Sequence, residues 1–399
     1  TYLILLRELL LYYYLVSSYF NECYKVLLMK QKKLFNVIGV MTGTSMDGID
    51  ISYVSTDGIK KIRIYNEKSY QYSIKEIQNI KKFLLIKKYP KDIIRNQDTK
   101  ITKLIVKYLS KFLKEFKVKK FDYISLSGQT IFHNPDKKIS IQLGNAKFVS
   151  KTFKTSVISN FRENDIKNGG QGAPIGAFYH KLLLDKINKK AVLINLGGVA
   201  NFALTYQRKF ISSDIGPANA LSDDLMMFFF KKNYDKNGIL ASKGKINLNI
   251  LNLFKKDKFF KQKIPKSLDR NNFHYLIKKL KRIKSHNALC TSIYFTIFSI
   301  MNLLEKDICS GINEIIFTGG GRKNKFLISQ FKYLNQKYKI SIIDNYGFDG
   351  DLLEAQMFAY IGVRSLKNLS LSSPHTTRVK KNVTGGNVYW EFLIIWFHD

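Results

Sequence analysis

The segment at residues 43–50, GTSMDGID, constrains the fold of this chain more than any other. A strand-like apolar run at 35–40 leads into it, and a second such run at 51–54 follows. Gly43 and Gly48 permit positive φ or a close approach to a ligand, which residues with a Cβ resist. A strand, a tight polar turn and another strand together predict a hairpin that grips phosphate.

The chemistry of this turn supports that interpretation. Thr44 and Ser45 offer hydroxyls and backbone N–H groups to an anion, while Asp47 and Asp50 offer the oxygen ligands that Mg²⁺ prefers. A P-loop would instead read GxxxxGK[ST] and open a helix. The alternative is an ordinary hairpin turn without a ligand.

Composition limits the partners of the chain. Its 399 residues are 45% hydrophobic, enough for two domains with cores. The formal charge of +36 comes from lysine spread along the whole sequence, so it predicts no nucleic-acid partner, although it would steer a polyanion such as ATP. Three cysteines without a CxxC pair favour a reducing cytoplasm.

The first residues form the least typical part of the chain. Residues 2–20 are almost wholly apolar, but Arg7 and Glu8 lie among them, and a charged pair is costly inside a membrane helix. We expect residues 1–34 to lie outside the fold, with Met29 as a plausible start, and expect no stable membrane association. An anchor or a signal-like element is the alternative.

The rest of the chain repeats one pattern, an apolar strand followed by a glycine turn. The repeats predict an α/β protein of two related halves that face each other across a nucleotide cleft. We place the first domain at 35–190 and the second at 191–353, and we expect a C-terminal helix around 354–388 to return to the first. The turns lie at residues 127–133, 169–174, 196–198 and 319–322.

These motifs, in this order, resemble the anhydro-N-acetylmuramic acid kinase family, which belongs to the actin, hexokinase and Hsp70 type of ATPase. The resemblance covers about residues 35–387 and implies two actin-like, ribonuclease H-like domains. Its motifs are GTSMDGID at 43–50, SGQT at 127–130, FRENDIKNGGQGAP at 161–174, NLGGVANF at 195–202, SDIGPAN at 213–219, YDKNG at 234–238, PKS at 265–267, TGGGRKN at 318–324, EAQMFAY at 354–360 and TGG at 384–386.

The resemblance implies an unusual reaction of cell-wall recycling. Water opens the internal bridge of 1,6-anhydro-N-acetylmuramic acid at the anomeric carbon, while ATP with Mg²⁺ phosphorylates the released 6-oxygen. Asp165 would be the general base that activates the water. Without the resemblance, Asp165 could equally be a helix cap.

The resemblance also implies roles for other residues. Sugar ligands would be Gln129, Thr130, Arg162 and Glu354. Arg162 suits a carboxylate through bidentate hydrogen bonds, although it could pair with an acidic neighbour, and Glu354 could simply favour a helix dipole. Asp47 and Asp214 would support Mg²⁺ through water. Phosphate and nucleotide would be held by Gly43, Thr44, Ser45, Met46, Asp47, Gly48, Ile49, Asp50, Gly197, Gly198, Gly319, Gly320 and Gly321.

Three positions depart from the family pattern. Ser127, Phe132 and Asn160 stand where the family usually has His, Arg and Asp. The sequence therefore leaves open a kinase of the same superfamily that acts on another sugar. A non-catalytic protein that switches with ATP is a second alternative, but such a protein should have lost Asp165. A homodimer is implied by the resemblance.

Overall fold

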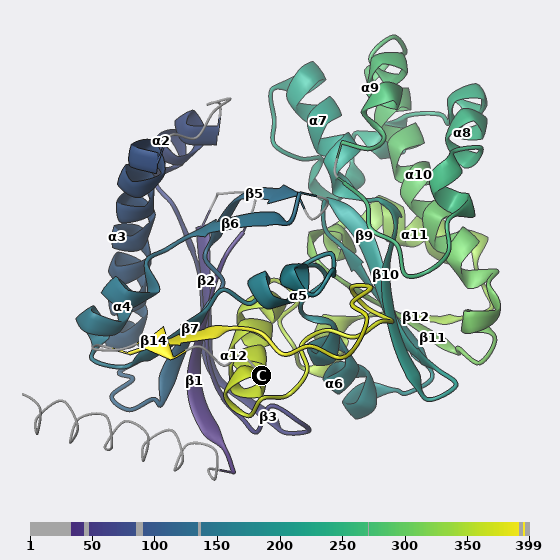
Figure 1. Ribbon diagram of the computed structural model, residues 1–399. Helices are drawn as coiled ribbons and strands as arrows, with labels where there is room; N and C mark the ends of the chain where they lie inside the picture. Colours follow the sequence, from purple (N-terminus) through teal and green to yellow (C-terminus); the bar gives the residue numbers. More distant parts are fainter. Residues whose placement is uncertain are drawn as a thin grey trace, which may run out of the picture.

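The computed structural model describes residues 33–43, 48–84, 91–134, 137–269, 271–390 and 394–395. Within them the chain forms two main β-sheets, with helices on their faces and between them (Figure 1). Of the predicted extension at residues 1–34, residues 1–32 lie outside the described part of the chain.

The first sheet has seven strands in the order β14-β13-β7-β4-β1-β2-β3. Its strands β1 to β3 form an antiparallel meander, and β4 and β7 continue the sheet parallel to β1. The central strand β1 is buried along most of its length, as expected where both faces of a sheet are covered. The strands are β1 (Phe35–Thr42), β2 (Gly48–Thr56), β3 (Ile62–Gln71), β4 (Tyr123–Leu126), β7 (Ser156–Ser159), β13 (Asn387–Tyr389) and β14 (Ile394–Ile395).

The second sheet repeats this arrangement. Its order is β10-β9-β8-β11-β12, again an antiparallel meander extended by two parallel strands. The repeated topology confirms the predicted α/β fold of two ribonuclease H-like halves, while the exact domain boundaries stay a prediction. Its strands are β8 (Ala191–Leu196), β9 (Val199–Tyr206), β10 (Lys209–Pro217), β11 (Glu314–Thr318) and β12 (Lys339–Ile342); a separate hairpin in the first half comprises β5 (Gln129–Asn134) and β6 (Ile139–Leu143).

Helices cover both sheets and separate them (Figure 1). Short 3-10 turns link the longer helices of the second half. The α-helices are α2 (Ile74–Leu84), α3 (Lys91–Glu115), α4 (Ala146–Phe153), α5 (Glu163–Lys167), α6 (Ala177–Ile187), α7 (Asn219–Phe230), α8 (Leu248–Lys255), α9 (His274–Leu280), α10 (Ser285–Leu304), α11 (Lys325–Leu334) and α12 (Leu353–Leu366); the 3-10 turns are η1 (Lys236–Gly238), η2 (Ala241–Lys243), η3 (Lys258–Lys261), η4 (Asp307–Cys309), η5 (Gly320–Lys323) and η6 (Ile343–Tyr346).

Helix α12 comes late in the chain but packs on β1 and β2 of the first sheet. It also contacts α6, which lies against β8 and β9 of the second sheet, so these two helices join the halves. A buried network crosses this layer, because Tyr179 donates to the Gln356 side chain at 2.6 Å and Gln356 donates to Glu67 at 2.6 Å. The layer fixes the two sheets relative to each other.

Helix α10 is the core helix of the second half. Among the described residues it alone is long and apolar enough to cross a membrane by length and composition. However, 72% of its apolar window is buried, and it packs against β10, α7 and α8.

Gly39 allows α12 to lie directly on β1, and this contact generates a prediction. A Cβ at Gly39 would overlap the carbonyl oxygen of Ala355 and lie 2.8 Å from the Ala359 nitrogen. We expect Gly39→Ala to lower the free energy of unfolding by about 2–3 kcal/mol, since the helix must move away. Urea denaturation measures this change.

Gly311→Ala is the matched control. No atom lies within 4 Å of a Cβ built at Gly311, so its substitution is expected to change stability by less than about 0.5 kcal/mol. Equal effects of the two substitutions would show that the α12 contact does not require a glycine.

Candidate active site

A cleft lies between the two halves of the molecule. Two adjoining cavities, of about 390 and 480 Å³, are lined from both sheets. The first half contributes the end of β1, the start of β5 and the segment after β7, and the second half contributes its glycine turns. The residues common to both cavities are Met41, Arg162, Ile175, Gly197, Gly320, Glu354 and Phe358.

The predicted phosphate hairpin joins β1 to β2, with Thr42 opposite Ile49. Thr44, Ser45, Met46 and Asp47 lie outside the described residues. Gly43 lines the cleft.

The residues after this turn belong to the sheet. Ile49 is buried in the core of the first half, and Asp50 pairs with Ser69 of β3 in the strand register. A Cβ at Gly48 would lie 2.5 Å from the Tyr70 carbonyl oxygen, so packing on β3 already requires this glycine.

Gln129 lies beneath the hairpin. Its side chain is fully buried and donates to the Gly43 carbonyl oxygen at 3.0 Å. The Ser127 hydroxyl accepts from the Thr42 backbone N–H at 3.1 Å. Of the residues predicted to bind sugar on this strand, Thr130 lines the cleft. The structure thus places Gln129 as a support for the turn.

The glycines of the second half fall into two groups. Gly197, Gly198 and Gly320 line the cleft, and a Cβ on any of them would meet no protein atom closer than 3.6 Å. Gly319 has φ of +72°, and a Cβ at Gly321 would lie 2.6 Å from the Leu196 Cβ. Packing therefore does not require glycine at Gly197, Gly198 or Gly320. It does require glycine at Gly319 and Gly321, where the turn lies on β8.

Arg322 holds this triple-glycine turn to the segment that leads into α12. Its side chain is only 2% exposed; Nε donates to Asp344 at 2.6 Å and Nη1 donates to Asp351 at 2.8 Å. Nη1 also donates to the Gly319 carbonyl oxygen at 3.1 Å. Burial lowers the pKa of Arg322, but the carboxylates of Asp344 and Asp351 outweigh that effect and raise it above its ordinary value, so the guanidinium is a fixed cation.

Asp165 lies within α5, behind the cleft wall. Only 1% of it is exposed, and its two carboxylate oxygens accept from the Gly172 N–H and the Thr377 hydroxyl, each at 2.5 Å. The N-cap of α5 is Arg162, so Asp165 does not cap that helix. Its carboxylate instead anchors the glycine-rich loop at 169–174.

Arg162 and Glu354 bring opposite charges to one wall of the cleft. Arg162 Nη1 donates to the Gly172 carbonyl oxygen at 2.8 Å, and Glu354 lies in the first turn of α12. Glu354 is accessible to the solvent of the open cleft, yet protein surrounds it on several sides. That desolvation raises the pKa of Glu354, and the Arg162 charge opposes the rise.

Asp214 lies on β10 and lines the smaller cavity with Asn195 and Asn201. Its Oδ2 accepts from the Leu268 N–H at 2.7 Å. Burial nevertheless raises its pKa to about 7, opposed by the nearby Lys266 charge. Among the described residues no group of three His, Cys, Asp or Glu side chains is suited to a metal ion.

The sequence did not predict that His180 would line the cleft or that Thr377 would contact Asp165. His180 of α6 lines the cavity; burial lowers its pKa to about 4, and its Nδ1 has no hydrogen-bond partner among the described residues. Its position after the GGQGAP loop was the available signal. Thr377 lies in a polar segment without a motif, and only the fold brings it to Asp165.

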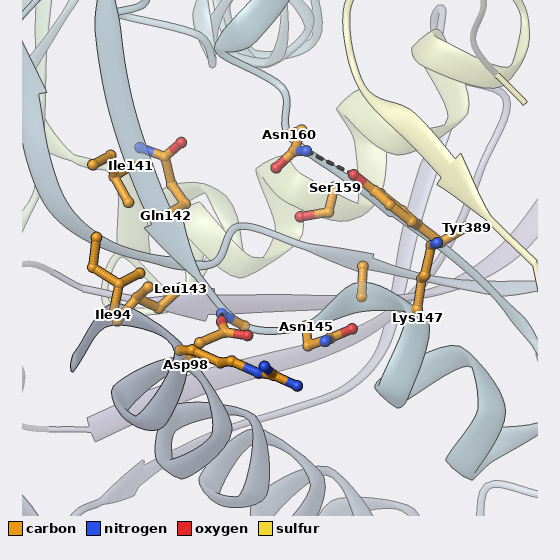
Figure 2. A pocket seen from close by; sticks show the side chains of 13 residues that line it. Ile94, Asp98, Ile141, Gln142, Leu143, Asn145, Lys147, Ser159, Asn160 and Tyr389 are labelled. Carbon is orange, nitrogen blue, oxygen red and sulfur yellow. Dashed lines mark hydrogen bonds between the residues drawn. The ribbon is translucent and has the colours of Figure 1, made fainter. Parts of the chain in front are cut away.

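A separate cavity of about 490 Å³ opens on the first half (Figure 2). It is lined by α3, β6, α4 and the end of β7, and Asn160 donates to the Tyr389 hydroxyl there at 2.6 Å. No glycine turn of the second half reaches it. The cleft between the halves, which those turns do line, is the candidate active site.

One protein family and its named members match most of this chain. The family described as "Anhydro-N-acetylmuramic acid kinase" matches residues 35–391. Relatives of that name are 36% identical in Pelagibacter ubique, over 89% of this chain and 98% of the relative, and 31% identical in Zymomonas mobilis, over 88% and 99%. A solved activator of 2-hydroxyisocaproyl-CoA dehydratase from Clostridium difficile with bound ADPNP superposes with a TM-score of 0.43 at 10% identity, over 83% of this chain and 96% of that one.

The buried Arg322 cluster generates a prediction on stability. Arg322→Met leaves Asp344 and Asp351 close together without their cation. We expect the free energy of unfolding to fall by about 2–4 kcal/mol, less than for a fully buried pair because both carboxylates are partly exposed. Lys323→Met is the control: Lys323 also pairs with Asp351 but is mostly exposed, so its loss should cost at most about 1 kcal/mol.

The raised pKa of Asp214 generates a prediction on pH. Between the ordinary value of 3.8 and about 7, the folded state retains a proton that the unfolded state releases, so stability falls as the pH rises through this window. Asp214→Asn removes this loss, and we expect it to be more stable than wild type by about 1–3 kcal/mol at pH ~7.5 but not at pH ~4. Urea denaturation at both pH values measures the difference; a gain independent of pH would contradict the assignment.

Proposed function

The chain belongs to the anhydro-N-acetylmuramic acid kinase family, and from that premise we propose that it is an ATP-dependent kinase of 1,6-anhydro-N-acetylmuramic acid. Water opens the 1,6-bridge and ATP phosphorylates the 6-oxygen, which gives N-acetylmuramic acid 6-phosphate and ADP. The observation that carries the proposal is the cleft between two like sheets, lined by glycine turns from both halves and by Arg162 and Glu354.

We assign the phosphates and nucleotide to the glycines that line the cleft. Gly43 of the first half lines the cleft, and Gly197, Gly198 and Gly320 of the second half allow close approach of a ligand to the backbone, since no protein atom lies within 3.5 Å of where their Cβ atoms would be. Such an arrangement would place the γ-phosphoryl group between the halves, where backbone donors neutralise its charge. The net positive charge of the chain would also attract the negatively charged ATP.

The donor groups fit a magnesium ion held mainly by phosphate and water. Mg²⁺ typically takes one or two carboxylates and keeps several waters, and Asp214 lines the cleft beside the amides of Asn195 and Asn201. When bound, the ion would neutralise charge on the transferred phosphoryl group. Asp214 would meet it as a carboxylate, so binding would release the proton that Asp214 holds near neutral pH.

Asp165 is the proposed general base. It takes a proton from water as the oxygen of that water bonds to the anomeric carbon and the bond from that carbon to the 6-oxygen breaks. The 6-oxygen then bonds to the γ-phosphorus, and ADP leaves. Because Asp165 is only 1% exposed and its oxygens accept from Gly172 and Thr377, the glycine-rich loop must shift before Asp165 meets water.

Arg162 and Glu354 would bind the sugar. The Arg162 guanidinium suits the lactyl carboxylate, and Glu354 could accept from the acetamide N–H or from a hydroxyl. Thr130 lies on the same wall. We infer a homodimer and a cytoplasmic location from the family alone.

The test is ADP release from ATP and Mg²⁺, with and without 1,6-anhydro-N-acetylmuramic acid. We expect release to depend on the sugar and Asp165→Asn to lower kcat by about 10²–10⁴-fold, the usual contribution of a general base. Glu163→Gln, on the same helix and paired with Lys167 at the surface, should keep near wild-type activity.

Two results would contradict the proposal. ATP binding without sugar-dependent ADP release would indicate another sugar, and the neighbourhood of Phe132 would be examined first. Full activity of Asp165→Asn would remove that residue from the chemistry.

A further inference from the structure

The segment at residues 372–386, beyond α12, lies over the glycine-rich loop and beside α5 (Figure 1). The Thr377 carbonyl oxygen accepts from the Gln171 N–H at 2.9 Å, and the Thr384 carbonyl oxygen accepts from the Asn164 side chain at 2.9 Å. This segment therefore braces the loop that carries Gly172.

Thr377 makes the most specific contact of the segment. It is fully buried, and its hydroxyl donates to Asp165 Oδ2 at 2.5 Å, while the Gly172 N–H holds Oδ1. A hydrogen bond to an ionised carboxylate is short and strong, so these two contacts fix the carboxylate plane. Were the loop to withdraw Gly172, Thr377 would be the remaining group that orients Asp165.

The same segment also touches the second half on both sides of Thr377. The His375 carbonyl oxygen accepts from the Ser212 N–H of β10 at 3.2 Å, and Arg378 Nε donates to the Pro265 carbonyl oxygen at 2.6 Å. Arg378 also has φ of +66°, a region that residues with a Cβ rarely adopt. A movement of the second half would thus reach Thr377 through its immediate neighbours.

We propose that Thr377 is a positioning residue that orients the Asp165 carboxylate, and that the contacts of its neighbours His375 and Arg378 with the second half couple this orientation to closure of the cleft. The inference rests on the proposed function, in which Asp165 takes the proton from water. Thr377 need touch neither sugar nor nucleotide, so its loss should lower the rate of the chemical step and leave substrate binding almost unchanged.

The test compares Thr377→Val with Thr377→Ser in the full chain. Valine keeps the shape but removes the hydroxyl, and we expect kcat to fall about 10–100-fold with KM for ATP and sugar within about threefold of wild type. Serine restores the donor and should recover kcat to within about threefold. A residue that only supported packing would not give this rescue together with unchanged KM.

Thr376→Val is the matched control. Thr376 is a buried neighbour whose hydroxyl accepts from the Ser373 N–H at 2.9 Å and donates to the Ser373 carbonyl oxygen at 3.0 Å, so its side chain bonds within a local turn and not to Asp165. We expect its kcat to stay within about twofold of wild type, even if the melting temperature falls. An equal loss of kcat in both valine variants would overturn the positioning role.

Arg378→Met tests the coupling and avoids the buried core, because Arg378 is exposed. We expect kcat to fall about 3–10-fold with KM unchanged; wild-type kcat in this variant would overturn the coupling, even if Thr377→Val did not fold. An inactive wild type would mean that the proposed function fails. An active wild type with inactive Asp165→Asn and fully active Thr377→Val would refute only the positioning role.

Discussion

The direct contact of α12 with β1 is the constraint on which the cleft depends. Gly39 lets the helix backbone approach the central strand, and the same helix touches α6, which lies on the second sheet. A helix near the end of the chain thereby brings Glu354 to the wall that also carries Arg162, which follows β7 of the first half. The Arg322 cluster then holds the entry to this helix against the triple-glycine turn, so the same layer positions cleft residues from both halves.

The glycines of the strands and turns serve two physical purposes, which the sequence alone does not separate. Gly39, Gly48 and Gly321 are required because a Cβ would collide with neighbouring atoms of the fold. Gly197 and Gly320 face the cleft, where a Cβ would meet no protein atom within 3.5 Å. Packing explains why Gly39, Gly48 and Gly321 lack a side chain. At Gly197 and Gly320 the missing side chain leaves room for a ligand.

Local patterns were sufficient to predict the two α/β halves and the glycine turns, because a strand and the turn that follows it are adjacent in sequence. They were not sufficient for contacts between distant residues. Gln129 lies 86 residues from Gly43, and Thr377 lies 212 residues from Asp165. The resemblance implied Gln129 as a sugar ligand, which stays a prediction, but its burial and its hydrogen bond to Gly43 could not be read from the sequence. Arg322 was visible only as the residue after the glycines, without its aspartate partners.

The burial of Asp165 bears on how such an enzyme would avoid wasting ATP. In the open cleft the carboxylate is almost inaccessible, and its two oxygens are held by Gly172 and Thr377. If Asp165 is the base, water would reach it only after the glycine-rich loop moves, and that loop is braced by a segment in contact with the second half. If closure around the sugar supplies the movement, the base is exposed only when its substrate is in place, and the phosphoryl group meets the released 6-oxygen before it meets free water.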